Sequence, residues 1–420
     1  MSIHIDPYEE AKKQLRATIE ILGLSEDVYE ALAVPERVVQ VKIPVRMDDG
    51  SVKVFIGWRS QHNSALGPYK GGVRYHPNVT MNEVIALSMW MTWKCSLAGL
   101  PYGGGKGGVR VDPKRLSFRE LERLSRGYFA AIADLVGEDL DIPAPDVYTD
   151  SQVMAWYLDE YYRVKRGQYF GVVTGKPFDL GGLIARIYST GLGVAITARE
   201  LAKKILGGVE GASVAVQGFG NVGYYAAKFL EEMGASVVAV SDSKGGIFKA
   251  SGLNIEEVKA VKDKTGSVIN YDKADRRVSN EELLELKVDI LVPSALENVI
   301  TEYNARNIKA KLVVEGANGP TTTEAERMLT EMGVIVAPDI LANAGGVIMS
   351  HIEWVNNRMG GWVTEEEARR KLEERMMNSI QTTWNFWESK LDKNRHNLRV
   401  AAYAVSVDRV VRAMKLRGWI

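Results

Sequence analysis

Three lysines in the first third of the chain lie in unusual surroundings. Lys70 in PYKGGVR and Lys106 in PYGGGKGG are each followed by two glycines, which leave the backbone bare beside the amine. Lys94 in WKCSL follows Leu87 by seven residues and Met91 by three, so it shares their apolar face of an expected helix. Ammonium groups that meet in one cleft repel each other and lose solvent, and both effects lower a lysine pKa. One such lysine could act as a base near neutral pH, while the others bind a substrate with more than one carboxylate.

Other polar residues near these lysines could also do chemistry. Asp146 lies in IPAPDVYTD, where two prolines stiffen the approaching chain and direct the side chain. His62 and His76 flank the Lys70 segment, and we interpret them as hydrogen-bonding residues of a loop, with proton transfer as the alternative. For Asp146 the alternative is an ordinary aspartate in a turn. For the three lysines the alternative is three unrelated surface residues.

A dinucleotide-binding fingerprint lies in the second half of the chain. Residues 218–223 read GFGNVG, between the strand-like ASVAVQ and the helix-like VGYYAAKFLEEMG. A second strand, SVVAVS, leads to Asp242, at 242 − 223 = 19 residues after the last glycine. Gly218 permits a tight turn, Gly220 lets the backbone approach a pyrophosphate, and Gly223 lets the helix pack close to the strand. The alternative is a glycine-rich turn that binds no ligand.

The residues at the end of the second strand bear on the choice of cofactor. Asp242 is placed to accept hydrogen bonds from the adenosine ribose, which favours NAD, and its charge would repel the 2′-phosphate of NADP. Ser243 and Lys244 follow directly and could hold that phosphate. We therefore predict that both NAD and NADP are used, with NADP at least competitive; the alternative for Lys244 is a solvated loop lysine.

Several local patterns predict the elements that position the lysines. Residues 8–22 have weak helical periodicity, and two β-branched runs within 38–58 flank Asp48-Asp49-Gly50, which indicates a hairpin. The glycine-rich stretch 61–77 (QHNSALGPYKGGVRYHP) is expected to be irregular. Capping boxes at Thr80–Glu83 and Ser117–Glu120 predict two helices, the first ending near residue 98.

A different composition begins near residue 185. Short apolar runs (VAVQ, VVAV, DILVPSA, KLVVEGAN and GVIVAPDI) alternate with amphipathic segments, which is typical of a doubly wound parallel sheet. A further helix is expected from Thr364. The predicted fold is therefore α/β with two domains, a mixed α/β substrate and assembly domain at 1–184 and a Rossmann-type dinucleotide-binding domain at 185–345. Helices in 346–420 are expected to return to the first domain.

Composition excludes several classes of protein. Apolar residues make up 46% and charged residues 25% of the 420 residues, as in soluble globular proteins. Lys plus Arg and Asp plus Glu are both 53, so no net charge attracts nucleic acid. The single cysteine, Cys95, excludes an intrachain disulfide, and neither it nor the five histidines indicate a metal site. The polar N-terminus, MSIHIDPYEEAKK, indicates neither a signal peptide nor a membrane span, so we expect a cytoplasmic protein.

These segments together resemble the glutamate dehydrogenase family, within the larger group of amino-acid dehydrogenases. The resemblance covers nearly the whole chain and is carried by QHNSALGPYKGGVR, WKCSLAGLPYGGGKGGVRVDP, DIPAPDV, TGKPFDLGG, STGLG, QGFGNVG, VSDSKGG, VEGANGP, NAGGV and SHIEW. It implies an N-terminal domain that binds the amino acid, a domain that binds NAD or NADP, and a cleft that closes for hydride transfer. It also implies a hexamer of identical chains.

The resemblance implies a role for each matching position. Lys106 would activate water and Asp146 would carry a proton to the substrate nitrogen, so that oxidation of glutamate through 2-iminoglutarate yields 2-oxoglutarate and ammonia. Lys94 would bind the α-carboxylate of the substrate. The pocket for its γ-carboxylate would be formed by Lys70, Thr174 and Ser350. The positions implied to contact the cofactor are Arg186, Thr190, Gly218, Phe219, Gly220, Asn221, Val222, Gly223, Asp242, Ser243, Lys244, Asn318 and Asn343.

Some positions depart from the family pattern. Tyr188 stands where an acidic residue is common, His351 where an aromatic residue is usual, and Cys95 where asparagine is common. We interpret Cys95 as a small buried side chain rather than a nucleophile.

Two rival functions remain. A leucine- or phenylalanine-type dehydrogenase would carry an apolar residue at position 70 and lack the hydroxyl of Ser350, so Lys70 and Ser350 favour a dicarboxylate substrate. A non-catalytic nucleotide-binding or scaffold protein would be free to lose Lys106 or Asp146, and both are present.

Overall fold

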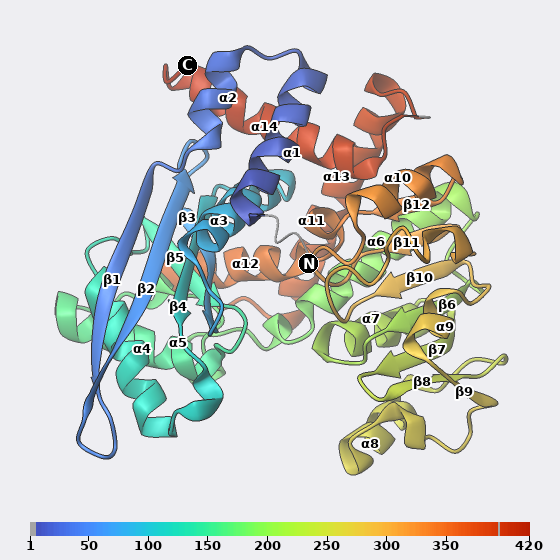
Figure 1. Ribbon diagram of the computed structural model, residues 1–420, viewed down its shortest axis with the longest axis horizontal. Coiled ribbons are helices and arrows are strands. Elements are labelled where there is room, and N and C mark those ends of the chain that lie inside the picture. The colour runs from blue at the N-terminus through green and yellow to red at the C-terminus, as the bar shows by residue number, and fades with distance from the viewer. Residues whose placement is uncertain (1–5, 394) are drawn as a thin grey trace. The chain divides into compact units, whose positions relative to one another are not determined.

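A computed structural model describes residues 6–393 and 395–420 of the chain (Figure 1). The residues form two compact units, each of which contains helices and a β-sheet, and this confirms the predicted α/β class. The first unit contains the chain up to Arg186, Met349–Ala368 and Ser406–Ile420, and the second contains Ile187–Ile348 and Arg369–Val405. The predicted division at residues 184 and 345 stays a prediction. Residues 369–405 of the expected C-terminal segment group with the second unit.

The first unit is built on a five-stranded sheet with the order β1-β2-β4-β3-β5. Its strands are β1 (Arg37–Arg46), β2 (Val52–Asn63), β3 (Tyr69–His76), β4 (Gly103–Arg110) and β5 (Asp141–Pro145). Strands β1 and β2 pair antiparallel from Arg37 opposite Gln61 to Arg46 opposite Val52, which confirms the predicted hairpin. Strand β4 is antiparallel to β2 and parallel to β3, and β3 is parallel to β5. Parallel pairing brings the Lys70 and Lys106 strands side by side.

The expectation of irregular structure at 61–77 was wrong, because β2 continues to Asn63 and β3 begins at Tyr69. Low strand propensity is overridden here by crowding around the backbone. A Cβ built on Gly71 would lie 1.6 Å from the carbonyl oxygen of Gly105, and one on Gly104 would lie 2.2 Å from that of Ser88. The glycines therefore permit close approach between the chain segments rather than flexibility.

Helices cover both faces of this sheet. They are α1 (Pro7–Leu22), α2 (Glu26–Ala33), α3 (Met81–Leu97), α4 (Phe118–Ile132) and α5 (Ser151–Lys165), with short 3-10 helices at Pro113–Arg115, Phe170–Val172, Phe178–Leu180 and Ile184–Arg186. Helix α3 begins where the sequence predicts, because the Thr80 side chain accepts from the backbone N–H of Glu83. Helix α4 begins at a full capping box formed by Ser117 and Glu120. Helix α3 packs on the face at Gly104, and Tyr128 of α4 packs on the opposite face at Gly107.

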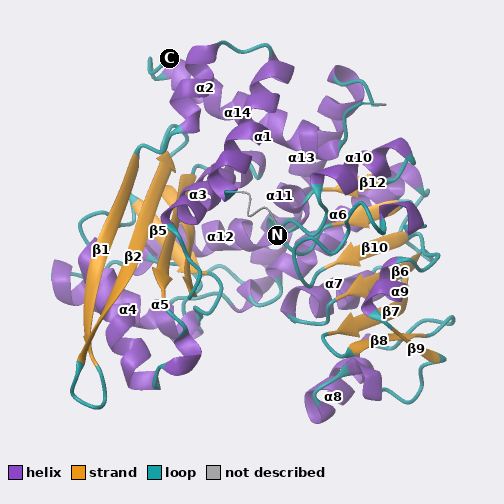
Figure 2. Cartoon of the chain, viewed as in Figure 1, coloured by secondary structure: helices purple, strands orange, loops and turns teal. Residues whose placement is uncertain are grey.

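The second unit contains a seven-stranded sheet with the order β12-β11-β10-β6-β7-β8-β9, whose strands lie side by side in Figure 2. The strands are β6 (Ser213–Gln217), β7 (Ser236–Asp242), β8 (Gly245–Phe248), β9 (Arg276–Val278), β10 (Ile290–Pro293), β11 (Leu312–Val314) and β12 (Ile335–Ala337). Five of them are parallel, whereas β8 and β9 add antiparallel. The strand order reverses beside β6, which confirms the predicted doubly wound arrangement.

The helices of the second unit precede, connect or follow these strands. They are α6 (Ser189–Ile205), α7 (Asn221–Glu232), α8 (Ile255–Thr265), α9 (Asn280–Leu284), α10 (Thr323–Glu331) and α11 (Asp339–Ala342), with short 3-10 helices at Val268–Asn270 and Ala305–Asn307. The strands read as continuous apolar runs because they are buried, for example Val214, Ala215 and Val216 of β6, each 0% exposed.

Three C-terminal helices each contribute residues to both units: α12 (Gly345–Met359), α13 (Glu365–Lys390) and α14 (Leu398–Leu416). Helix α13 begins at the predicted place, since Thr364 Oγ1 accepts from the backbone N–H of Glu367 at 3.2 Å. The apolar side chains at four-residue steps along this helix are buried, namely Leu372, Met376, Ile380 and Trp384. None of the helices in the described part of the chain combines the length and apolar composition needed to cross a bilayer.

Candidate active site

Lys106 and Asp146 form an ion pair, with Lys106 Nζ 2.7 Å from Asp146 Oδ1. Lys106 lies on β4 and its side chain is only 6% exposed. Asp146 directly follows β5, and its backbone N–H donates to Thr149 Oγ1 at 2.8 Å, so the turn holds the carboxylate in place. The two residues that the sequence singled out for acid–base chemistry are therefore in direct contact.

Arg74 on β3 completes this cluster and was missed by the sequence reasoning. Its Nε lies 2.8 Å from Asp146 Oδ2, and its Nη1 lies 2.6 Å from Glu83 Oε1 on α3. The only signal for it in the sequence is its spacing, because Arg74 is four residues after Lys70 and alternation puts both on one face of β3.

Burial and charge act in opposite directions on this pair. Burial lowers the pKa of Lys106, Asp146 opposes that shift, and the positive charges of Arg74 and Arg59 add to it. Burial by itself would raise the pKa of Asp146, but Lys106 and Arg74 outweigh it and hold that pKa well below its usual range. The site therefore combines an ionised carboxylate with an amine that releases its proton more easily than a surface lysine.

Lys70, on β3, is 1% exposed. Its pKa is lowered to about 7, mainly by burial; the charges of Arg186 and Arg59 contribute to this shift, and Cys95 and Glu353 oppose it. Burial raises the pKa of the Cys95 thiol to about 12 against the charges of Lys70 and Lys94. The same thiol thus lies within electrostatic reach of both lysines, one on β3 and one on α3. The predicted meeting of three lysines in one cleft stays a prediction.

A second buried ion pair joins the loop that carries Thr174 to the helix that carries Ser350. Lys176 Nζ lies 2.7 Å from Glu353 Oε1, with both side chains 0% exposed, and the backbone N–H of Gly175 donates to Glu353 Oε2 at 2.9 Å. Glu353 lies three residues after Ser350 on α12, so the pair ties the helix to the loop that carries Thr174.

The Thr174 loop is also tied to the sheet. The backbone N–H of Thr174 donates to the carbonyl of Pro143, which is opposite Gly71 in the β3–β5 ladder. The Thr174 hydroxyl is buried and has no hydrogen-bond partner among the described residues, as expected of a group that binds a ligand.

The glycine fingerprint adopts the geometry that its sequence predicts. Gly218 has φ 89°, and a Cβ on Gly223 would lie 1.8 Å from the carbonyl oxygen of Gly218. A Cβ on Gly220 would meet no described atom within 4 Å, so space for a ligand exists beside the N-terminus of α7. A pyrophosphate fits this donor set of backbone N–H groups.

Asp242 is already hydrogen bonded within the chain. Its Oδ1 accepts from the N–H of Lys244 at 2.9 Å and from Ser267 Oγ at 3.0 Å, and its Oδ2 accepts from the N–H of Val268 at 2.8 Å. Its expected contact with the ribose stays a prediction, now with few acceptor positions left. Ser243 and Lys244 are exposed.

Lys262 on α8 is a cation near this loop that the sequence reasoning missed. Its Nζ donates to the carbonyl of Phe219 at 2.7 Å and lies 4.0 Å from Asp242 Oδ2. It therefore holds a carbonyl of the glycine loop in place.

Asn318 and Asn343 lie together, since Asn343 Nδ2 donates to Asn318 Oδ1 at 2.9 Å. The loop after β11 that carries Asn318 is fixed by Arg399. The Arg399 guanidinium contacts three carboxylates at 2.6–2.9 Å, which belong to Glu315, Glu326 and Asp339. Arg186 and Thr190, predicted as a pair, belong to different units.

The positions that depart from the family pattern are packed or hydrogen bonded. Tyr188 packs edge-on against Phe229, and His351 packs edge-on against Tyr102. Burial lowers the pKa of His62 to about 4, and its ring nitrogens contact Thr92 Oγ1 and the carbonyl of Leu32. His62 is thus a hydrogen-bonding residue, as interpreted, although on a strand.

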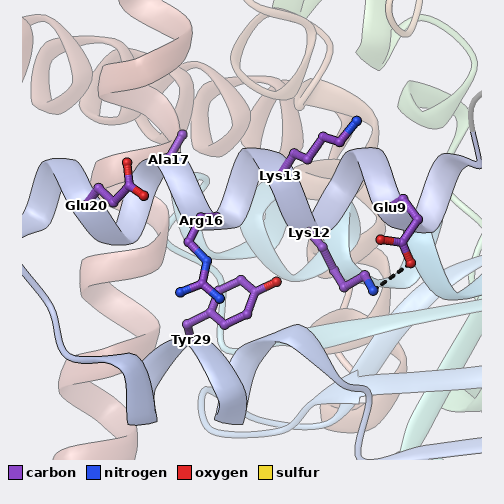
Figure 3. Close-up of a pocket in the computed structure, with 7 residues that line it drawn as sticks. All are labelled: Glu9, Lys12, Lys13, Arg16, Ala17, Glu20 and Tyr29. Atoms are coloured by element: carbon purple, nitrogen blue, oxygen red, sulfur yellow. Dashed lines mark ion pairs between the residues drawn. The ribbon is translucent and has the colours of Figure 1, made fainter.

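A surface hollow of about 320 Å³ along α1 does not include any predicted site residue (Figure 3). Lys12 pairs with Glu9 at 2.6 Å, and the Arg16 guanidinium lies 3.3 Å above the Tyr29 ring. The hollow is therefore lined mainly by charged side chains of α1, together with Tyr29. The described residues also contain no cluster of His, Cys, Asp or Glu arranged for a metal ion.

The sequence matches two family models. The model described as Glutamate/Leucine/Phenylalanine/Valine dehydrogenase matches residues 181–418. The model described as Glu/Leu/Phe/Val dehydrogenase, dimerisation domain, matches residues 35–163.

Individual relatives agree over almost the full length. A glutamate dehydrogenase of Aeropyrum pernix is 68% identical, with 99% of each chain covered. An NADP-specific glutamate dehydrogenase of Saccharolobus shibatae is 56% identical, covering 97% of this chain and 95% of the relative. A cryptic catabolic NAD-specific glutamate dehydrogenase of Bacillus subtilis is 49% identical, covering 99% and 97%. A hetero-hexameric glutamate dehydrogenase of Thermus thermophilus superposes with a TM-score of 0.91 at 38% identity, covering 100% of this chain and 98% of that one.

Proposed function

The chain belongs to the glutamate/leucine/phenylalanine/valine dehydrogenase family, and on that premise we infer that it catalyses the reversible oxidative deamination of L-glutamate. The products are 2-oxoglutarate and ammonia, and the oxidant is NAD or NADP. The observation that carries this function is the buried contact of 2.7 Å between the Lys106 ammonium and the Asp146 carboxylate. A base and an acid in contact are what exchange of a proton between water and an amino nitrogen requires.

The substrate is held by its two carboxylates. Lys94 binds the α-carboxylate, and Lys70, Thr174 and Ser350 bind the γ-carboxylate. Support comes from the burial of Lys70 and from the Thr174 hydroxyl, which has no partner among the described residues. A buried ammonium is stabilised by an opposite charge, so the bound carboxylate raises the pKa of Lys70 above its value of about 7.

Lys106 and Asp146 move the protons. Lys106 in its neutral form takes a proton from the water that attacks the imine carbon. The contact with Asp146 gives this proton a direct path to the leaving nitrogen. Asp146 starts ionised because its pKa is held low, so it accepts the proton before passing it on.

When bound, NAD or NADP would supply the acceptor for the hydride of the substrate Cα. The glycine loop from Gly218 to Gly223 holds the pyrophosphate, and open space at Gly220 supports this assignment. Arg186 and Thr190 contact the nicotinamide end, and Asn318 and Asn343 contact the nicotinamide ribose.

At the adenosine end, Asp242 has only limited capacity to accept from a ribose hydroxyl, because three N–H or O–H groups of the chain already use it. The exposed Ser243 and Lys244 provide a hydroxyl and an ammonium for a 2′-phosphate. Both cofactors are used, with NADP at least competitive.

We propose further that residues 1–184 form the substrate and assembly domain, 185–345 the nucleotide domain and 346–420 a returning segment. The enzyme assembles as a hexamer of identical chains and works in the cytoplasm. The size of the purified protein in solution tests the assembly.

Turnover of the purified chain tests the function. L-glutamate, L-leucine and L-phenylalanine are each supplied with NAD or NADP, and formation of the reduced nicotinamide is followed by absorbance. Glutamate should be preferred with either cofactor, and the Lys106→Ala protein serves as the control. Preference for leucine or phenylalanine would contradict the assigned substrate.

A further inference from the structure

A buried guanidinium lies on the opposite face of the sheet from the lysines. Arg59 is 1% exposed and lies on β2 opposite Gly107, whereas Lys106 lies opposite the neighbouring residue, Ser60. Successive side chains on a strand point to opposite faces. Arg59 and Lys106 therefore project from opposite sides of the same pair of strands.

Arg59 links its own strand, β2, to two other strands of the sheet, β3 and β5. From β2 its Nε donates to Asp141 Oδ2 on β5 at 2.8 Å, and its Nη2 contacts Asp141 Oδ1. Its Nη1 donates to the carbonyls of Gly71 and Gly72 on β3 at 3.2 and 3.4 Å. Both carboxylate oxygens are thus engaged by one planar guanidinium, a geometry that lysine cannot reproduce.

Strand β4 lies between β2 and β3, and two of its glycines lie close to this guanidinium. A Cβ on Gly105 would lie 3.1 Å from Arg59 Nη2, and one on Gly107 would lie 3.2 Å from Arg59 Nη1. These two glycines flank Lys106. The bare backbone beside the amine therefore leaves room for a guanidinium on the reverse face.

The ladder between β3 and β4 is altered at the same place. Paired residues run from Tyr69 to Lys70 and again from Val73 to His76, with Gly71 and Gly72 between them. The carbonyls of these two glycines are the ones that accept from Arg59. Gly71 and Gly72 pair with β5 instead, and the side-chain N–H groups of Arg59 add donors to their carbonyls.

We propose that Arg59, held by Asp141, is a positioning residue for Lys106, fixing the spacing of β3, β4 and β5 from which Lys106 reaches Asp146. This inference rests on the proposed catalytic role of Lys106. The electrostatics agree with it, since the charge of Arg59 lowers the pKa of both Lys106 and Lys70. The other charged groups that act on Lys106 are Asp146 and Arg74, and neither is altered in the test.

The test compares Arg59→Lys, which keeps the charge, with the double variant Arg59→Met/Asp141→Leu, which removes both buried charges. Replacing a buried ion pair by apolar residues of similar size can preserve folding. Arg126→Met is the matched control, because Arg126 forms ion pairs on the surface of α4 with Glu122 and Asp159. The fraction of molecules that bind cofactor measures the folded fraction, so turnover is expressed per cofactor-binding molecule.

We expect kcat per folded molecule to fall at least ~10-fold in both Arg59 variants, because a displacement of ~1 Å in a reacting group can cost ~100-fold. The KM for the cofactor should stay within about twofold of the parent, since the nucleotide loop belongs to the other unit. The acid limb of kcat/KM should move in the double variant, because a displaced Lys106 stands at a different distance from Asp146 and Arg74, whose charges act on its pKa. A purely structural role would lower the folded fraction without moving that limb.

Parental kcat and an unmoved acid limb in the double variant would show that Arg59 only neutralises Asp141, and the proposal would fail. Variants that yield no cofactor-binding molecules would make Arg59 a folding element, which also counts against it. The proposed function is judged separately on the parent protein, whose failure to oxidise glutamate would not depend on any Arg59 variant.

Discussion

Replacing Asp146 by asparagine should move the pH dependence of turnover in a direction fixed by the ion pair. Asp146 opposes the effect of burial on the Lys106 pKa, whereas Arg74 adds to it. The asparagine side chain would have nearly the same shape without the charge. Lys106 would then lose its stabilising carboxylate and keep the repulsion from Arg74. Loss of the carboxylate lowers the pKa of Lys106, and nothing then opposes Arg74, so the acid limb of kcat/KM should shift to lower pH.

The distance between the charges sets the size of the shift. Two unit charges about 4 Å apart interact by ~4 kcal/mol at an effective dielectric constant of ~20, equivalent to ~3 pH units. Asp146 is 19% exposed, so solvent weakens the interaction. We therefore expect a shift of roughly 1–2 units, the lower part of the range for one opposite charge. Turnover itself should fall ~10²–10⁴-fold because the proton carrier is lost.

The assay is kcat/KM for glutamate at saturating cofactor, measured from about pH 5 to about pH 10 for the parent and the variant. Arg74→Gln is the matched control. It removes a positive charge beside Lys106, so its acid limb should move to higher pH, opposite to that of Asp146→Asn. If both variants shift in the same direction, or if neither shifts, the acid limb does not report Lys106 and the assigned base is wrong.

Four further predictions concern the lysines of the site and of the nucleotide loop. Lys106→Ala should lower turnover at least ~10²-fold with nearly normal cofactor binding; near-normal deamination would remove Lys106 from the mechanism. The double variant Lys70→Leu/Ser350→Val should lose activity on glutamate and gain activity on norleucine or methionine. A persistent preference for glutamate in competition assays would refute the assignment of the γ-carboxylate pocket. Lys244→Ala should weaken NADP binding by roughly 1–2 kcal/mol and leave NAD binding nearly unchanged; equal losses for NAD and NADP would show that Lys244 does not contact the phosphate. Lys262→Met should raise the Michaelis constants for both NAD and NADP.

Local patterns predicted much of the fold. Caps at Ser117 and Thr364, the hairpin at Asp48-Asp49-Gly50 and the strand–helix–strand unit around the glycine fingerprint are determined by residues only a few positions apart. Such signals are visible in one sequence because their physics is local.

The glycine strands could not be predicted in the same way. Isolated glycines disfavour strands, and what overrides this preference is crowding from distant segments, such as Ser88 against Gly104 and Tyr128 against Gly107. Those contacts exist only after the chain has folded.

The candidate site was predictable to a similar extent. Lysines with unusual neighbours and an aspartate between prolines stand out in the sequence, and Lys106 and Asp146 do meet. The buried ion pairs around the site do not stand out, because Arg59 and Asp141 are 82 residues apart and Lys176 and Glu353 are 177 apart. An arginine or glutamate with a distant partner looks like any surface charge until the fold brings the two together.

The burial of Cys95 offers a direct measure of local opening in the working enzyme. It is the only thiol of the chain, it is 0% exposed, and its pKa of about 12 leaves almost no thiolate at neutral pH. A thiol reagent can modify it only after the segments packed around this part of α3 open locally. The labelling rate therefore reports the free energy of that opening, without any introduced probe. Glutamate bound to Lys70 should slow the labelling. A single labelling rate would therefore report both substrate occupancy and the local opening around α3.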